Sequence, residues 1–424
     1  MRLKIIVTGF LLLTTALKAQ IIFDDYFEDK TLRFDYFHSG NFENEFYSFD
    51  KMIDEGNWNG SKVNLIDTIK YGNSFVKIIS LGNDSLIYSR GFSTLFREWQ
   101  TTGEAKKIKR TFYETVTFPF PKDSVKLQLL NRDSSNKFVK KYEIIIDPEN
   151  PFIKEKEDTL QNFKIHYSGN PEEKLDIVFI PEGYTEAEMK KFYKVCDTLA
   201  NYLFSYEAFG NHKDKINIWG VEAPSVESGT DIPHDDQWRN TELNSSFYTF
   251  GSERYLMTSD YFSVRNAASN APYEQIYILV NTEKYGGGSI FNYYSMISAE
   301  HPAVKEIFIH ELGHGFAGLA DEYVTDDVAY LDFYNLEVEP WEANITTLVN
   351  FDSKWKYMLD AETPVPTPDS IRYKNTLGVF EGGGYIPKGI YRPTKVSIMN
   401  SLSAKYFNEP SKEAIRKLIK FYSE

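Results

Sequence analysis

The spacing of apolar residues changes near residue 150, and this change divides the 424-residue chain into two parts. Before it, short runs alternate between apolar and polar residues and are separated by turn residues, as in "KVNLIDTIKYGNSFVKIISLGNDSLIYSRGF" (62–92). Alternation of this kind predicts β-strands with one buried face. We therefore predict an all-β sandwich over residues 20–150.

The second part has a different pattern. It follows a linker rich in proline and charge, "DPENPFIKEKEDTLQ", and opens with the continuous apolar run "LDIVFIPEGY", which predicts a buried strand. A capping box from Thr185 to Glu188 then begins a helix, and "EQIYILVN" predicts a second buried strand. Strands that alternate with helices predict an α/β domain over residues 160–424, so the fold class of the whole chain is α+β or α/β.

Composition limits the possible partners. The chain has 47 Lys and Arg against 61 Asp and Glu, a formal net charge of −14, which argues against binding to nucleic acid or to an anionic membrane.

The single cysteine, Cys196, excludes an internal disulfide and is expected to be buried on a helix. His38 has no partner at metal-binding spacing, so we expect it to be a packed or a surface histidine.

The first residues, "MRLKIIVTGFLLLTTALKAQ", combine basic residues, a short apolar run and small residues ending at Ala19. This pattern predicts a signal peptide over residues 1–19. No cysteine follows it to carry a lipid anchor, and no other stretch reaches the ~18 apolar residues of a membrane span. We therefore expect a secreted, periplasmic or extracellular protein.

The stretch "IFIHELGHGFAGLADEY" (307–323) carries the clearest chemistry. Residues four apart on a helix lie one turn above each other, so His310 and His314 can point their nitrogens at one metal ion. Glu311 lies beside them, where it can act on a water molecule. This is the H-E-x-x-H motif of zinc peptidases, and the site is predicted to bind Zn²⁺. The alternative is an amphipathic helix that contains histidine incidentally.

A catalytic zinc ion needs a third protein ligand. Gly315 and Gly318 can end the helix and turn the chain back, which would bring Asp321 within reach of the metal. Asp321 is the first choice, but three other carboxylates stay open as alternatives. These are Glu322, Glu337 and Glu339.

These residues resemble the metzincin type of zinc peptidase, in which a methionine turn follows the helix. The spacing between His314 and Gly318 is one residue longer than in that pattern. The chain is more closely similar to the IgA-peptidase family, the sixty-fourth family of metallopeptidases. The similarity lies in "HELGHGFAGLADEY", "EGGGYIPKGIYRPTKVSIMNS" and "DIVFIPEGYTEAEM", and in "LRFDYFHSGN" for the N-terminal β domain.

The resemblance implies a metzincin-like zincin catalytic domain that hydrolyses peptide bonds of extracellular proteins. It implies that His310, His314 and Asp321 bind zinc and that Glu311 is the general base. Met399 would form the methionine turn, where Ser397 stands in place of the cysteine expected in many relatives. Tyr391, just before that turn, would be a second catalytic residue that helps bind metal or stabilises the oxyanion.

A protein or peptide substrate would bind extended along an edge strand near "YGGGSIFNYY", where glycines 286–288 let another backbone come close. A flexible turn is the plainer interpretation of these glycines. Two other functions compete with peptide hydrolysis. One is a secreted binding module on a peptidase fold, attached to glycan or host protein; the other is a zinc amidohydrolase acting on a non-peptide amide.

Overall fold

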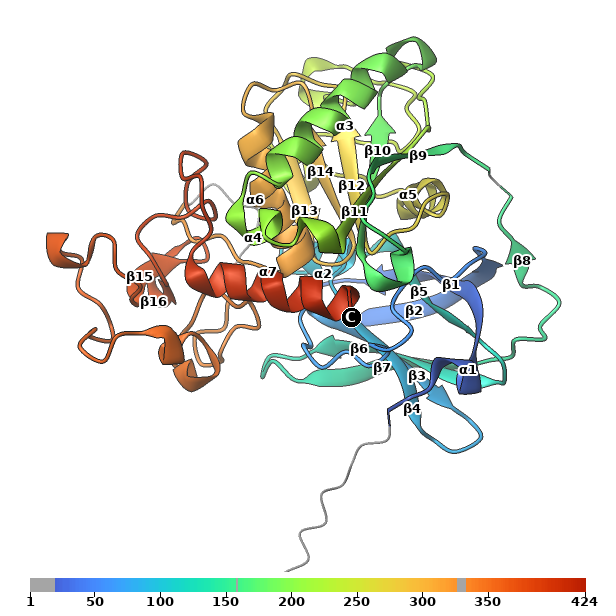
Figure 1. Ribbon diagram of the computed structural model, residues 1–424, viewed down its shortest axis with the longest axis horizontal. Helices are drawn as coiled ribbons and strands as arrows, with labels where there is room; N and C mark the ends of the chain where they lie inside the picture. Colours follow the sequence, from blue (N-terminus) through green and yellow to red (C-terminus); the bar gives the residue numbers. More distant parts are fainter. Residues whose placement is uncertain (1–19, 158, 326–332) are drawn as a thin grey trace, which may run out of the picture.

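The computed structural model describes residues 20–157, 159–325 and 333–424 (Figure 1). The N-terminal strands lie in the lower part of Figure 1, and a mixed sheet with helices lies above them. The predicted signal peptide lies outside the described residues. None of the helices in the described part of the chain combines the length and apolarity needed to span a bilayer.

The N-terminal part forms two four-stranded sheets in the orders β5-β1-β2-β8 and β4-β3-β6-β7. Their inner faces share one apolar core, to which β1 contributes Phe34 and Tyr36 and β6 contributes Leu127. The strand-rich prediction is therefore confirmed. The elements are α1 (Phe23–Tyr26), β1 (Phe27–Gly40), β2 (Glu45–Asp54), β3 (Ser74–Ser80), β4 (Leu86–Phe92), α2 (Leu95–Trp99), β5 (Arg110–Pro121), β6 (Val125–Arg132), β7 (Phe138–Ile146) and β8 (Lys154–Glu155).

The second part is built on a six-stranded sheet in the order β13-β14-β12-β10-β11-β9. Its central strands are parallel and fully buried, whereas the edge strands β13 and β9 run antiparallel to their neighbours. Parallel strands with continuous apolar runs are covered on both faces. The elements are β9 (Asn162–His166), β10 (Leu175–Glu182), α3 (Met189–Leu203), α4 (Glu207–Gly210), β11 (Ile216–Val221), α5 (Tyr261–Ala268), β12 (Gln275–Val280), β13 (Gly287–Ile290), β14 (Tyr294–Ser298), α6 (Val304–Ala317), β15 (Phe380–Gly383), β16 (Ile386–Arg392) and α7 (Glu409–Tyr422).

The two parts are joined by polar and packing contacts. Arg33 on β1 donates to the side-chain oxygen of Asn266 on α5 over 2.8 Å. The end of α7 reaches the N-terminal sheets, where Asn64 donates to the carbonyl of Phe421 and Arg90 lies over the Phe421 ring. These contacts fix the N-terminal sheets against the part that carries the histidine motif.

Of the two expectations for His38, packed or at the surface, the structure shows the packed one, and charged groups surround the ring. It is buried between the rings of Tyr47 and Phe96, and its two ring nitrogens lie 3.0 Å from carboxylate oxygens of Glu114 and Glu45. Burial opposes the charged imidazole, but the two carboxylates outweigh it and raise the pKa of His38 above its usual 6.5. His38 is therefore part of a buried ion cluster.

Replacing His38 by Gln is expected to lower the free energy of unfolding by about 3 kcal/mol, because the buried Glu114 loses the cation that it faces, whereas Glu45 keeps Lys141 at 2.8 Å. Since the folded pKa is raised, the contribution of His38 is complete below pH 6.5 and is lost as pH rises through the folded pKa. Urea unfolding at several pH values measures this. The exposed His234 provides the matched control, His234→Gln. Equal unfolding free energies for the His38 variant and the wild type would contradict the prediction.

Candidate metal centre

Helix α6 carries both histidines of the motif and ends at Gly318, which has a left-handed φ of 59°. That conformation favours glycine and turns the chain back toward the helix. Gly315, by contrast, lies inside α6, so the expectation that it helps to end the helix was wrong. A Cβ on Gly315 would come within 2.2 Å of the Ser295 hydroxyl, so this glycine serves the close packing of α6 on β14.

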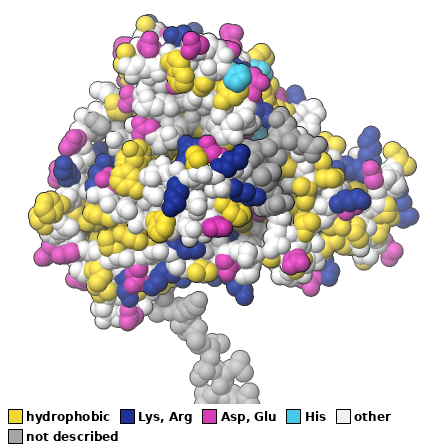
Figure 2. Space-filling model, turned by 180° about the vertical axis from the view of Figure 1, so that it is seen from behind, with side chains coloured by type: hydrophobic (Ala, Val, Ile, Leu, Met, Phe, Trp, Pro, Cys, Tyr) yellow, Lys and Arg dark blue, Asp and Glu magenta, His cyan; other side chains and the backbone are white. Residues whose placement is uncertain are grey.

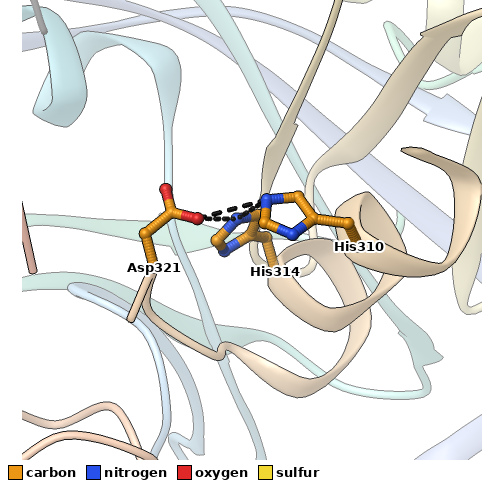
Figure 3. Close-up of side chains that lie close together, drawn as sticks. All are labelled: His310, His314 and Asp321. Carbon is orange, nitrogen blue, oxygen red and sulfur yellow. Dashed lines mark hydrogen bonds and ion pairs between the residues drawn. The ribbon is translucent and has the colours of Figure 1, made fainter. Parts of the chain in front are cut away.

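The turn after Gly318 brings Asp321 to the two histidines (Figure 3). The Nε2 atoms of His310 and His314 are 3.1 Å apart, and Asp321 Oδ1 lies 3.1 Å from the first and 3.3 Å from the second. A tetrahedral ion with bonds of about 2.0–2.1 Å separates its ligands by about 3.3 Å. Asp321 Oδ1 is buried and has no other hydrogen-bond partner in the described chain. The three residues therefore fit a metal ion.

The other nitrogen of each imidazole is held by a backbone carbonyl. His310 Nδ1 donates to Ile398 over 2.9 Å, and His314 Nδ1 donates to Leu319 over 2.5 Å. Bonds of this kind fix the tautomer and orient the ring, so that Nε2 is the nitrogen left to bind a metal. Both carbonyls come from segments that lie beyond the helix.

The ionisable groups of the cluster shift the pKa values of one another. Burial opposes the charged form of His314, but the Asp321 carboxylate outweighs it and raises the pKa of His314 to about 9. Burial works against the charged carboxylate too, yet the two imidazoles hold the pKa of Asp321 far below its usual value. A metal ion would replace the proton that Asp321 retains on His314.

The structure does not bring the alternative carboxylates to the cluster. Glu322 is buried in a separate polar group, where it accepts hydrogen bonds from Asn344, Asn408 and Ser397 over 2.6–2.8 Å. The hydroxyl of Ser397 is thus occupied by Glu322. The remaining two glutamates lie further along the chain. Glu337 is exposed, and Glu339 accepts from the backbone N–H of Asn350 over 2.8 Å.

The segment expected to form the methionine turn packs against α6. Met399 is fully buried, and a Cβ on Gly313 would come within 2.6 Å of its sulfur. The Met399 carbonyl accepts from the backbone N–H of Glu322 over 2.8 Å. Met399 therefore supports both the helix and the turn that carries Asp321.

Tyr391 is not brought to the cluster. It lies on β16, exchanges two backbone hydrogen bonds with Thr346, and packs against an apolar group that includes Trp355. Tyr385 lies at the cluster instead, since its hydroxyl donates to Asp321 Oδ2 over 2.8 Å. The sequence offered one signal for Tyr385, the preceding run of three glycines.

The backbone of Tyr385 is held in an unusual conformation. Its φ is 72°, which is strained for an aromatic residue, and the neighbouring Gly384 N–H donates to the Asp321 carbonyl over 2.8 Å. Strain of this kind persists only where the surroundings enforce it, and it gathers at functional sites. The glycine turn thus aims the phenol at the carboxylate.

Replacing Tyr385 by Phe is expected to weaken metal binding by about 10–100-fold, the usual cost of losing a partner that orients a metal ligand. Replacing Tyr391 by Phe should leave metal affinity unchanged, because its side chain lies elsewhere. Competition with a chromogenic chelator measures both affinities. The reverse pattern would restore the role expected of Tyr391 and remove the one assigned to Tyr385.

A cavity of about 760 Å³ lies beside the cluster. Its lining includes the three cluster residues, Glu311 and the edge strand β13. A Cβ on Gly287 would come within 3.2 Å of Glu311 Oε1, so this glycine lets the carboxylate approach the strand. Gly287 and Gly288 therefore open a strand that passes close to Glu311, and Gly286 directly precedes it.

Two imidazoles, one carboxylate and a neighbouring glutamate at a large cavity define a candidate metal site with a group able to accept a proton beside it. The comparisons agree with a hydrolytic class. The chain belongs to the family described as IgA Peptidase M64, which matches residues 163–375, and the Peptidase M64 N-terminus matches residues 22–143. No curated protein matches the chain. The resemblance inferred from the motifs is confirmed, and the chain is a member of a peptidase family.

Proposed function

We propose that this protein is a secreted, zinc-dependent endopeptidase with a metzincin-like catalytic domain at 160–424 and a β-sandwich domain at 20–150. The observation that carries the proposal is the convergence of His310 Nε2, His314 Nε2 and Asp321 Oδ1 within 3.3 Å of one another, beside Glu311. Two imidazoles and one carboxylate suit zinc, and three ligands leave a position for water.

Zinc bound there would lower the pKa of a water molecule and polarise a peptide carbonyl. Glu311 takes the proton of the attacking water and delivers it to the leaving amine. His310 and His314 stay in one tautomer because their Nδ1–H groups donate to backbone carbonyls. Tyr385 holds the outer oxygen of Asp321, so that the inner oxygen faces the histidines.

The substrate would lie extended along β13. On the side away from β14, β13 already makes two backbone hydrogen bonds at Gly287. The Gly287 N–H donates to the carbonyl of Arg254, and the Gly287 carbonyl accepts from the N–H of Leu256. Backbone groups repeat their direction every second residue, so those of Ser289 point to the same side. Ser289 lines the cavity, which makes it the residue with which an extended peptide would pair.

The two competing functions are less well supported. A binding module on a peptidase fold has no use for a proton acceptor such as Glu311 beside its metal ligands. For a zinc amidohydrolase, the cavity of about 760 Å³ lies within the usual size range of small-molecule sites, but a small amide makes no use of the edge strand beside it. An extended peptide is the substrate that uses both features.

Purified protein is expected to contain one zinc ion per chain and to cut unfolded proteins at internal bonds. Removing the ion with a chelator should abolish cleavage, and added zinc should restore it, because the ligands are preformed. Mass spectrometry of the fragments and elemental analysis measure both. Hydrolysis of small non-peptide amides without any protein cleavage would overturn the proposal.

A further inference from the structure

The cavity beside the metal cluster is built from both parts of the chain. The N-terminal part lines it with residues from α2 and the segments on either side of it, from the loop before β3 and from the end of β6, among them Asn73, Thr94, Arg97, Glu98, Thr101 and Arg132. A peptide that fills the cavity therefore touches the N-terminal part. We call these six residues the N-terminal wall.

The N-terminal wall is held at a fixed place along β13. The Ser93 N–H, just before α2, donates to the carbonyl of Phe291 over 2.9 Å, directly beyond the end of the strand. Glu98 accepts from the Tyr255 hydroxyl over 2.5 Å, and a Cβ on Gly288 would come within 2.4 Å of the Tyr255 ring. The wall is thus attached both at the end of β13 and over its middle.

Arg97, a residue of the N-terminal wall, has one donor, Nε–H, without a hydrogen-bond partner in the described part of the chain. Its Nη1 donates to the side chain of Gln100 over 2.5 Å and its Nη2 to the carbonyl of Arg132 over 3.0 Å. Its Nε is buried and makes no hydrogen bond within the described part of the chain. The same holds for Asn73 Oδ1, an acceptor on the same wall. Buried polar atoms without partners are costly and point to a ligand that satisfies them.

The charge around Arg97 is also incompletely balanced. Its nearest carboxylate among the described residues is Glu45 at 4.0 Å, and Glu45 already contacts His38 at 3.0 Å and Lys141 at 2.8 Å. The neighbouring Arg132 donates to backbone carbonyls, such as that of Gly72 over 2.7 Å. Although the chain carries a net charge of −14, Figure 2 shows Lys and Arg side chains gathered near the middle of one face.

We propose that Arg97 determines specificity in a subsite on the N-terminal wall, which binds the carboxylate side chain of an Asp or Glu residue in the extended substrate. A guanidinium offers Nε–H and Nη2–H side by side, an arrangement that suits a carboxylate. Asn73 Oδ1 would accept a backbone N–H of the same peptide. The inference rests on the proposed function and adds a substrate class to it.

The test uses peptides that carry Glu, Gln or Lys at one position in turn around the cleaved bond. At one position, wild type should cleave the Glu peptide about tenfold faster than the Gln peptide in kcat/KM, the usual scale of one charge-assisted contact. Arg97→Met should equalise the two rates, and Arg97→Lys should keep part of the preference. The matched control is Arg110→Met, because Arg110 lies in the same region but pairs with Glu104. Its preference should equal that of wild type.

Binding to the Glu311→Gln variant separates this inference from the proposed function. That variant should bind the Glu peptide about tenfold more tightly than the Gln peptide, and adding Arg97→Met should remove the difference. Cleavage with equal rates for Glu and Gln at every position would overturn the inference and leave the proposed function intact. Absence of any cleavage by wild type would overturn the proposed function, while the binding difference would still decide the role of Arg97.

Discussion

The Glu311→Gln variant is expected to lose peptide hydrolysis by roughly 10²–10⁴-fold in kcat/KM, the range that a positioned proton acceptor contributes. Glutamine has nearly the same shape but cannot take the proton of the attacking water. The metal cluster should be unaffected, because His310, His314 and Asp321 contact one another directly. Activity should therefore fall without loss of bound zinc.

The same helix provides a matched control for this variant. Glu306 lies in the first turn of α6 and accepts from the Tyr202 hydroxyl over 3.2 Å, away from the cluster. Glu306→Gln should keep both zinc and activity. Unchanged proteolysis in Glu311→Gln, with zinc content equal to wild type, would remove Glu311 from the mechanism. Loss of zinc from that variant would instead give Glu311 a role in holding the cluster.

The helical part of the site could be predicted because its geometry is local. Spacing alone places His310 and His314 on one face, and the buried Phe308 and Leu312 confirm the apolar side of that helix. The position of Asp321 depended on a turn, and Gly318 supplied a readable signal for it. Local signals in the sequence were therefore enough to predict that Asp321, the proposed third ligand, lies at the two histidines.

Contacts between distant segments were not readable in the same way. Tyr385 reaches Asp321 from 64 residues away, in a chain with 29 tyrosines, and the run of three glycines before it is its one local signal in the sequence. The polar loop at 224–246 is exposed at residues 226–228 and 234–236, but its end is tied to the core. There the buried Glu182 accepts from the backbone N–H of Leu243 over 2.9 Å and of Ser245 over 2.8 Å. The polar composition of the loop does not reveal this contact.

The N-terminal part gave the least information about its own role. An alternating pattern predicts the same β-sandwich whether that sandwich is a separate domain or lines a cavity together with another domain. The wall residue Arg97 lies on a five-residue helix between two strands, and nothing in its spacing connects it to a histidine more than 200 residues away. Such a connection depends on how the two sheets dock, which periodicity does not encode.

Adjacent acidic residues in the segment "ADEY" provide the sharpest test of the metal cluster, because Asp321 and Glu322 should fail in different ways. Asp321→Ala removes the carboxylate that lies 3.1 Å from His310 Nε2 and 3.3 Å from His314 Nε2. Zinc affinity should fall by more than about 100-fold. Losing a residue that only orients a ligand already costs up to about 100-fold, and losing the ligand itself should cost more. The unfolding free energy of the metal-free protein should fall as well, because His314 and the Tyr385 hydroxyl lose a buried partner. The zinc affinity of the folded fraction is therefore the quantity that distinguishes the two variants.

Glu322→Ala should lower stability but leave zinc affinity unchanged. It removes the acceptor for three buried donors, on Asn344, Ser397 and Asn408, and should lower the unfolding free energy by roughly 3–5 kcal/mol. Protein that remains folded should still bind one zinc ion. Urea unfolding in chelator and zinc titration of the folded fraction measure the two effects separately. If Glu322→Ala were stable and free of zinc while Asp321→Ala bound the ion normally, the third ligand would be Glu322, and the turn after Gly318 would have to open to bring it to the histidines.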